Sequence, residues 1–274
     1  MKIIQQTNMT RKQSMGYVIQ TKSGHVLVVD GGAAGNEGEL ERLIKSVGGH
    51  VDLWLITHPH DDHHDAARLL LSSDTDITFD KLGSSLLPNE WGVSTGIPVD
   101  AQELADWNEF LPSIADKHFE IKEGQVFELG SMKVEVLAGA NPDILTNPFN
   151  NQSCVFRLTE DDFTMLILGD LGVEAGKRLM EKGYDLHADA VQMAHHGQRG
   201  VQEDFYQAVK PTYAFWPTPL WLWVNSRAKV IIPDSANFKT PETIEWTRKL
   251  GTVNIVSFSH TMMFDSETKE ISKY

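Results

Sequence analysis

The apolar run Val51–Thr57 (VDLWLIT) constrains the fold of this chain more than any other feature of its sequence. Almost all of its residues are apolar, which is typical of a strand that is covered on both faces. Similar short runs recur along the chain and alternate with amphipathic stretches, such as Glu37–Val47, which has apolar residues at helical spacing. Strands with interleaved helices predict a layered α/β fold.

The same pattern predicts the other elements. We expect a hairpin of Gly16–Gln20 and His25–Val29, which turns at residues 22–24. The irregular stretch 137–151 is interpreted as a long loop over a site. With no repeat or linker in view, residues 1–274 are expected to form a single domain. Further strands are expected at 133–137, 153–158, 164–168, 190–194, 213–216 and 253–258, and helices at 63–71, 101–115, 173–181, 203–209 and 241–250.

Composition narrows the class of partner. The chain has 274 residues, 24 Lys and Arg against 38 Asp and Glu, and a net charge of −14. This acidity counts against binding to duplex nucleic acid or to an anionic membrane. The single cysteine excludes an intrachain disulfide, and no apolar run approaches the ~20 residues of a membrane span. We therefore expect a cytoplasmic protein.

The strongest chemical signal is the segment 57–65 (THPHDDHHD), which begins where the strand 51–57 ends. Four of the eleven histidines lie within seven residues here. Imidazole and carboxylate groups are ligands of first-row metals, and ligands in open α/β sheets collect at the carboxyl ends of strands. A polar loop with one aspartate capping the next helix would need no histidines. The segment is therefore interpreted as part of a metal site.

Two further polar segments follow expected strands. Asp170 comes directly after Gly169 and the run 165–168, and His195-His196-Gly197 closes the strand 190–194. A Gly-Asp pair alone is typical of a turn, but paired histidines at a strand end are more specific. Along the chain, the candidate ligands therefore follow the order His-x-His-x-Asp-His, then a single Asp, then a His.

This order resembles the metal-binding motifs of the metallo-β-lactamase fold superfamily, over roughly residues 15–265. The resemblance rests on 58–63, Asp170, His195-His196 and the Asp30-Gly31-Gly32 turn. It implies a four-layer αββα sandwich, with two central sheets and helices outside, and a site for two divalent metal ions between the sheet edges. His58 and His60 would bind the first ion, Asp62 and His63 the second, and Asp170 would bridge both.

The resemblance also implies that one of the paired histidines, His195 or His196, is a ligand of the second ion. The superfamily's ligand usually follows a small residue at the strand end, which favours His195 as the ligand of the second ion. His196 would then face the substrate or act as a general acid. With Asp62, it is an expected catalytic residue. Asp30 and Thr57 are expected to orient ligand histidines through hydrogen bonds, or else to be a turn aspartate and a strand-end threonine.

The sequence also departs from the superfamily pattern. Many members have another histidine for the first metal, but no histidine lies between His118 and His187. Asn150-Asn151-Gln152-Ser153 occupies that place, and an asparagine there, Asn151 above all, is expected to bind substrate or water. The pattern resembles the branch of the competence-channel hydrolase domain and the phosphorylcholine esterases, which act on phosphodiesters. His64-Asp65 replaces the usual glycine after Asp-His.

The resemblance also excludes some chemistries. Oxygen-reducing members have Glu where His60 stands, glyoxalase-type thioesterases have the missing histidine, and Cys154 lies within an expected strand. Nitrogen and oxygen ligands without a thiolate suit zinc first, with manganese or iron as alternatives. Two such ions can lower the pKa of a bridging water to about neutrality, and the hydroxide would attack phosphorus.

These inferences predict a metal-dependent phosphodiesterase for a small or single-stranded substrate, and they leave the oligomeric state open. Hydrolysis of an ester, lactone or lactam and a non-catalytic metal-binding regulatory module remain alternatives. The stretch 215–223 holds three of the seven tryptophans. It is either core packing or an aromatic wall in which Trp216 and Trp221 contact the substrate.

Overall fold

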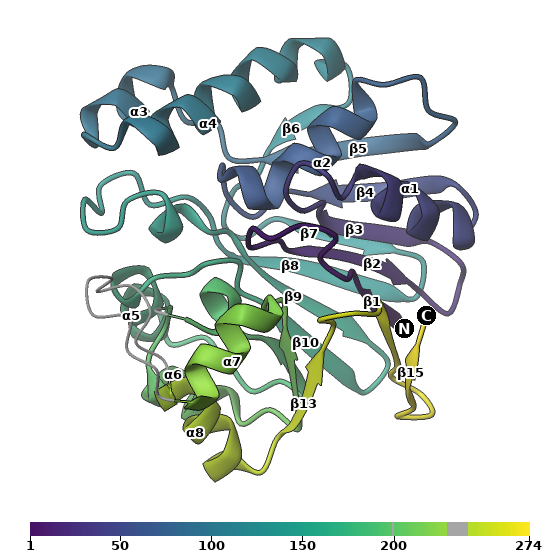
Figure 1. Ribbon diagram of the computed structural model, residues 1–274, viewed down its shortest axis with the longest axis vertical. Helices are drawn as coiled ribbons and strands as arrows, with labels where there is room; N and C mark the ends of the chain where they lie inside the picture. The colour runs from purple at the N-terminus through teal and green to yellow at the C-terminus, as the bar shows by residue number, and fades with distance from the viewer. Residues whose placement is uncertain (199, 229–240) are drawn as a thin grey trace.

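The computed structural model describes residues 1–198, 200–228 and 241–274. Its strands form an eight-stranded and a seven-stranded sheet (Figure 1). The first sheet has the order β15-β14-β1-β2-β3-β4-β5-β6, formed by Ile271–Lys273, Met262–Asp265, Lys2–Gln5, Gly16–Gln20, Val26–Asp30, His50–Leu55, Thr78–Ser84 and His118–Glu120. The second has the order β13-β12-β11-β10-β9-β8-β7, formed by Val253–Val256, Tyr213–Trp216, Ala190–Gln192, Phe163–Ile167, Val155–Glu160, Met132–Ala138 and Val126–Leu129.

The helices lie outside the two sheets. Figure 1 shows α1 to α4 beside the first sheet and α5 to α8 beside the second. The α-helices are α1 Glu37–Ser46, α2 Asp61–Leu71, α3 Asn89–Ser94, α4 Pro98–Phe110, α5 Val173–Glu181, α6 Glu203–Val209, α7 Leu220–Ala228 and α8 Pro241–Leu250. Short 3₁₀ turns form η1 Leu111–Ile114, η2 Asn150–Gln152 and η3 Ala194–Gly197.

Strand β3 shows how the sequence builds these layers. Its side chains alternate between faces, as the pleat requires. Leu27 and Val29 enter the core between the sheets, together with Phe156 of the second sheet. Val26 and Val28 enter the core beneath the helices. Buried apolar groups on both faces of the strand confirm the predicted four-layer αββα sandwich.

Parallel strand pairing brings the site loops together. Strands β3 to β6 pair in parallel in one sheet, and so do β10 to β13 in the other. The polar segments after β3, β4, β10 and β11 therefore leave carboxyl ends of strands, where ligands collect in α/β sheets. None of the described helices is long and apolar enough to cross a membrane.

Most predicted elements are confirmed with shifts of a few residues, but the sequence pattern did not predict β1, β5, β6, β7, β14, β15, α3 or α7. The polar stretch Thr78–Ser84 forms β5, because it pairs in parallel with β4 and β6. The aromatic stretch at 215–223 includes the start of helix α7. That residues 1–274 form a single domain stays a prediction.

Candidate metal centre

The loop between β4 and α2 carries His58 and His60, and the first turn of α2 carries Asp62 and His63. The turn after β3 fixes this helix start, since the backbone N–H groups of Gly31 and Gly32 donate to the carbonyl oxygen of His63 at 2.8 and 3.2 Å. A Cβ atom at Gly31 would lie 2.8 Å from Ala67. Only glycine allows this approach, which explains why the turn and the histidine motif occur together.

Asp30 orients the ligand histidines, as predicted. The Nδ1–H of His63 donates to Asp30 Oδ2 at 2.7 Å. Thr57 donates from its backbone N–H and its hydroxyl to the same carboxylate, at 2.7 and 2.9 Å. Because the hydroxyl proton of Thr57 points to Asp30, Thr57 Oγ1 accepts from His58 Nδ1 at 3.1 Å. Both histidines therefore present Nε2 as the free ligand atom.

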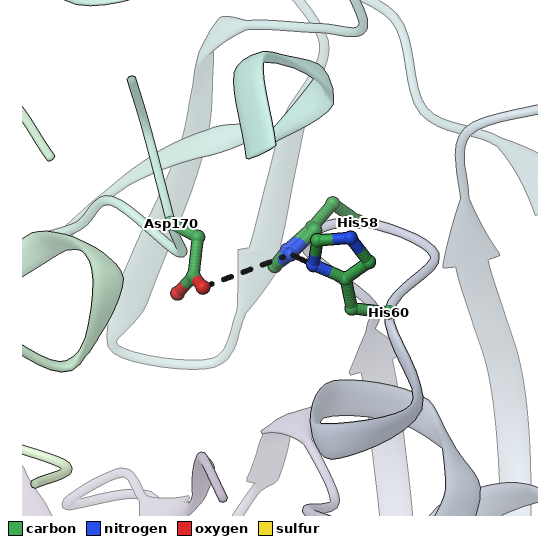
Figure 2. Close-up of side chains that lie close together, drawn as sticks. All are labelled: His58, His60 and Asp170. Atoms are coloured by element: carbon green, nitrogen blue, oxygen red, sulfur yellow. Dashed lines mark hydrogen bonds and ion pairs between the residues drawn. The ribbon is translucent and has the colours of Figure 1, made fainter. Parts of the chain in front are cut away.

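One group of donors consists of His58, His60 and Asp170, whose ligand atoms all lie within 4.8 Å of one another (Figure 2). His58 Nε2 is 3.0 Å from His60 Nδ1 and 4.0 Å from Asp170 Oδ2. We refer to these three residues as the first group. They match the predicted ligands of the first metal.

Asp62, His63 and His196 form the second group, also within 4.8 Å. His196 Nε2 is 3.0 Å from Asp62 Oδ2. Asp170 lies beside this group as well, with Oδ1 3.2 Å from His63 Nε2 and Oδ2 3.6 Å from His196 Nε2. One carboxylate therefore reaches both groups, which is the arrangement of a bridging ligand.

The donor atoms of these groups fit metal ions. His63 Nε2, His196 Nε2 and Asp170 Oδ1 are buried, and despite their proximity they form no hydrogen bond of good geometry. Buried polar atoms are normally paired, so unpaired atoms that converge on one point indicate a bound ion. Burial alone would raise the pKa of Asp170, but the charges of His196 and His63 outweigh it and hold that pKa well below its usual range. The bridging carboxylate is thus ionised at neutral pH.

The structure groups His196, and not the expected His195, with Asp62 and His63. His195 and His196 both have positive φ, at 51° and 53°, so the backbone makes a left-handed turn after β11. This turn buries His196 completely and leaves the His195 side chain 20% exposed, 3.7 Å from Asp170. The Nδ1–H of His196 donates to the carbonyl of Pro217 at 2.7 Å, which directs Nε2 to the second group.

Trp216 does not contact a substrate site. It is 1% exposed and donates from Nε1 to Asn254 Oδ1, and Trp223 meets it edge to face. A Cβ atom at Gly197 would lie 2.3 Å from its ring, so Trp216 packs directly against the left-handed turn that carries His195 and His196. Trp221 differs, because it is 37% exposed and lines the cavity above the metal groups.

Asn151 is also absent from the cavity wall. Its Nδ2 donates to Thr146 O and Glu174 Oε2, and its Oδ1 accepts from the backbone N–H of Ala175 at 3.0 Å. These bonds cap the start of α5 and use the whole amide. The neighbouring Asn150 lines the cavity instead.

Two adjoining cavities, of about 480 and 540 Å³, lie beside the first and second groups. They share the lining residues Gln13, His60, Asp100 and His195. Asp100 and Glu103 of α4 line the cavity of about 480 Å³, and burial raises the pKa of Glu103 to about 7. The sequence reasoning missed these two residues. They are isolated charges on an amphipathic helix, and only the packing of α4 against α2 brings them to His60.

No protein-family model matches the chain. The structure is similar to the metallo-β-lactamase fold protein YhfI from Bacillus subtilis, with a TM-score of 0.55, 12% identity, and 97% of this chain and 100% of that chain covered. It is also similar to CmlA, a diiron β-hydroxylase from Streptomyces venezuelae, with a TM-score of 0.57, 12% identity, and 100% and 54% covered. The chain therefore has the metallo-β-lactamase fold.

Among curated proteins, the chain is 26% identical over 165 residues to ComE operon protein 3 of Bacillus subtilis (strain 168). The match covers 60% of this chain and 19% of that protein. The chain thus corresponds to about a fifth of the relative's length. This relative is consistent with the branch that the sequence motifs resemble.

Proposed function

We propose that this protein is a metal-dependent hydrolase that cleaves a phosphodiester in a small or single-stranded substrate. The observation that carries the proposal is the pair of donor groups joined by Asp170. Two such sites a few Å apart are typical of enzymes that transfer phosphoryl groups to water. Nitrogen and oxygen donors suit zinc first, with manganese or iron as alternatives. The only cysteine, Cys154, lies in the core between the sheets.

When two divalent ions are bound, they supply water activation at neutral pH and offset the negative charge of a phosphate. The chain's own residues set the balance of charge around them. Asp62 and Asp170 contribute two negative charges against four positive ones, so the centre retains an excess that suits one phosphodiester. Asp30 and the Pro217 carbonyl hold His63 and His196 in place. His195, on the cavity wall, is our candidate for protonating the leaving oxygen.

The charges of the side chains that line the cavities favour a substrate with few phosphates. Lys12 is the one cationic side chain other than histidine among the described residues that line the two cavities, and it pairs with Asp61 at 2.7 Å. Asp100 adds negative charge beside His60, and Glu103, with a pKa of about 7, adds part of a charge at neutral pH. Long polyanions would be repelled by these charges, whereas one diester can reach the metal ions. Duplex nucleic acid is therefore excluded from the proposal.

The test compares substrates on one preparation. The metal-loaded chain is assayed with bis-p-nitrophenyl phosphate, a chromogenic lactam and a p-nitrophenyl ester. We expect hydrolysis of the diester to exceed that of the other two, and His58→Ala to abolish it. His187→Ala, an exposed histidine outside both groups, is the control. Faster turnover of the lactam or the ester would refute the phosphodiesterase proposal, and full activity of His58→Ala would refute the metal mechanism.

A further inference from the structure

The two donor groups are not equally complete. The second group has three residues of its own and shares Asp170, which makes four protein donors. Among the residues that the structure describes, the first group consists of His58, His60 and the shared Asp170. Zinc sites usually have at least three protein ligands and often four, so the first group has room for another donor from the chain.

The segment that replaces the missing histidine supplies one candidate. It consists of Asn150, Asn151, Gln152 and Ser153, all buried. Asn151 caps α5, as described above. Gln152 bonds through both ends of its amide to the backbone of Asn141 at 2.8 and 3.0 Å. Ser153 Oγ accepts from the backbone N–H of Asp170 at 2.9 Å. Three of the four side chains are therefore used within the protein.

Asn150 is the exception. It is 6% exposed, and its Nδ2 donates to Asn147 Oδ1 at 2.8 Å. That bond fixes the amide so that Oδ1 is the remaining atom, and Oδ1 is buried without a hydrogen-bond partner. A buried acceptor without a partner costs roughly 1–3 kcal/mol, and a bound ion or water is one way in which a native protein satisfies it.

The position of Asn150 connects it to the first group. It lines the cavity of about 540 Å³ that His60 and His195 also line. The preceding residue, Phe149, stacks on the His60 ring with centroids 5.6 Å apart and an interplanar angle of 12°. The side chain next to Asn150 in the sequence is therefore packed directly against a donor of the first group.

We propose that Asn150 completes the first metal site, with Oδ1 as an oxygen donor in the place of the missing histidine. This inference rests on the proposed metal centre but not on the substrate. An amide oxygen is a harder and weaker donor than imidazole. The first site therefore binds its ion less tightly than the second, and its preference shifts from zinc toward manganese.

The test measures metal binding rather than turnover. Metal-free chain is titrated with Zn²⁺ and with Mn²⁺ by calorimetry, and the Co²⁺-loaded chain is followed by visible absorption. Asn150→Ala should weaken only the weaker site, by about tenfold or more, since loss of a supporting partner costs 10–100-fold. Asn150→His should tighten Zn²⁺ binding at that same site and change its Co²⁺ spectrum. Leu145→Ala, an exposed residue of the same loop, is the control.

The outcomes separate the two proposals. Unchanged affinities in both Asn150 variants, or a wild-type chain that binds one ion even at saturating Mn²⁺, would overturn the role of Asn150. Two ions bound with the expected variant effects, but without diester hydrolysis, would overturn the phosphodiesterase and leave this inference intact. Thermal melts check that each variant is folded. Should Asn150→Ala not fold, Asn150→His decides alone, because unchanged Zn²⁺ affinity would contradict the proposal.

Discussion

The two metal groups are built from similar residues but are held in different ways. In the second group, His63 is fixed by Asp30 and His196 by the Pro217 carbonyl, and both histidines are fully buried. In the first group, His60 is partly exposed and stacks on a loop residue, while Asp100 lies 3.4 Å from its Nε2. The histidines of the second group are thus held within the protein, whereas His60 of the first group faces the cavity.

The largest expected effect comes from the residue that the groups share. Asp170→Asn preserves the shape of the side chain but removes its charge, so both ions lose a ligand. We expect diester hydrolysis to fall by about 10³-fold, the upper end for loss of one electrostatic contact. Asp189→Asn, outside both groups, is the matched control. A loss of less than tenfold, with metal content unchanged, would show that Asp170 does not bridge the two groups.

Asp30→Asn sharpens the comparison, because Asp30 bonds His63 of the second group directly and reaches His58 of the first group only through Thr57. The amide cannot satisfy Thr57 and His63 as the carboxylate does, so His63 loses its orientation. We expect a 10–100-fold weaker affinity at the tighter site, with the weaker site changed far less. Calorimetric titration with Zn²⁺ measures the affinities of the tighter and the weaker site separately. Equal weakening at both sites would mean that the groups are not separately supported.

The two tryptophans test which region meets the substrate. Trp221→Ala should raise the KM for the diester several-fold without lowering thermal stability. Trp216→Ala should instead reduce the free energy of unfolding by about 3–5 kcal/mol, the usual cost of emptying a core aromatic site. Steady-state kinetics and urea unfolding measure the two effects. A stable, active Trp216→Ala variant would contradict its role beneath the histidine turn.

The smallest expected effect concerns the charge of the cavity lining. Asp100→Asn removes negative charge beside the first group, and Glu103→Gln does so above pH 7, because the pKa of Glu103 is about 7. Partly exposed charges contribute roughly 0.2–1 kcal/mol, so the KM for an anionic diester should fall about two- to fivefold. The fall should shrink at high salt, because ions screen these charges. An unchanged KM at low salt would show that the charges of Asp100 and Glu103 do not affect binding of the diester.

The sequence predicted the parts of the site that depend on local segments. The motif 58–63 and Asp170 follow strands that are apolar runs, so their convergence could be inferred from the rule for strand ends. The order of His195 and His196 could not, because it depends on a left-handed turn that only the surrounding contacts impose. The choice between Asn150 and Asn151 likewise depends on the cap of α5.

The most direct measurement of the central claim is the number of ions that five chains bind at saturating Zn²⁺. The account predicts two ions in the wild type and in His195→Ala, one in His58→Ala, and one in His196→Ala. Asp170→Asn should retain fewer than two. Two ions in His196→Ala with one in His195→Ala would reverse the histidine assignment, and fewer than two in the wild type would contradict the two-metal centre itself.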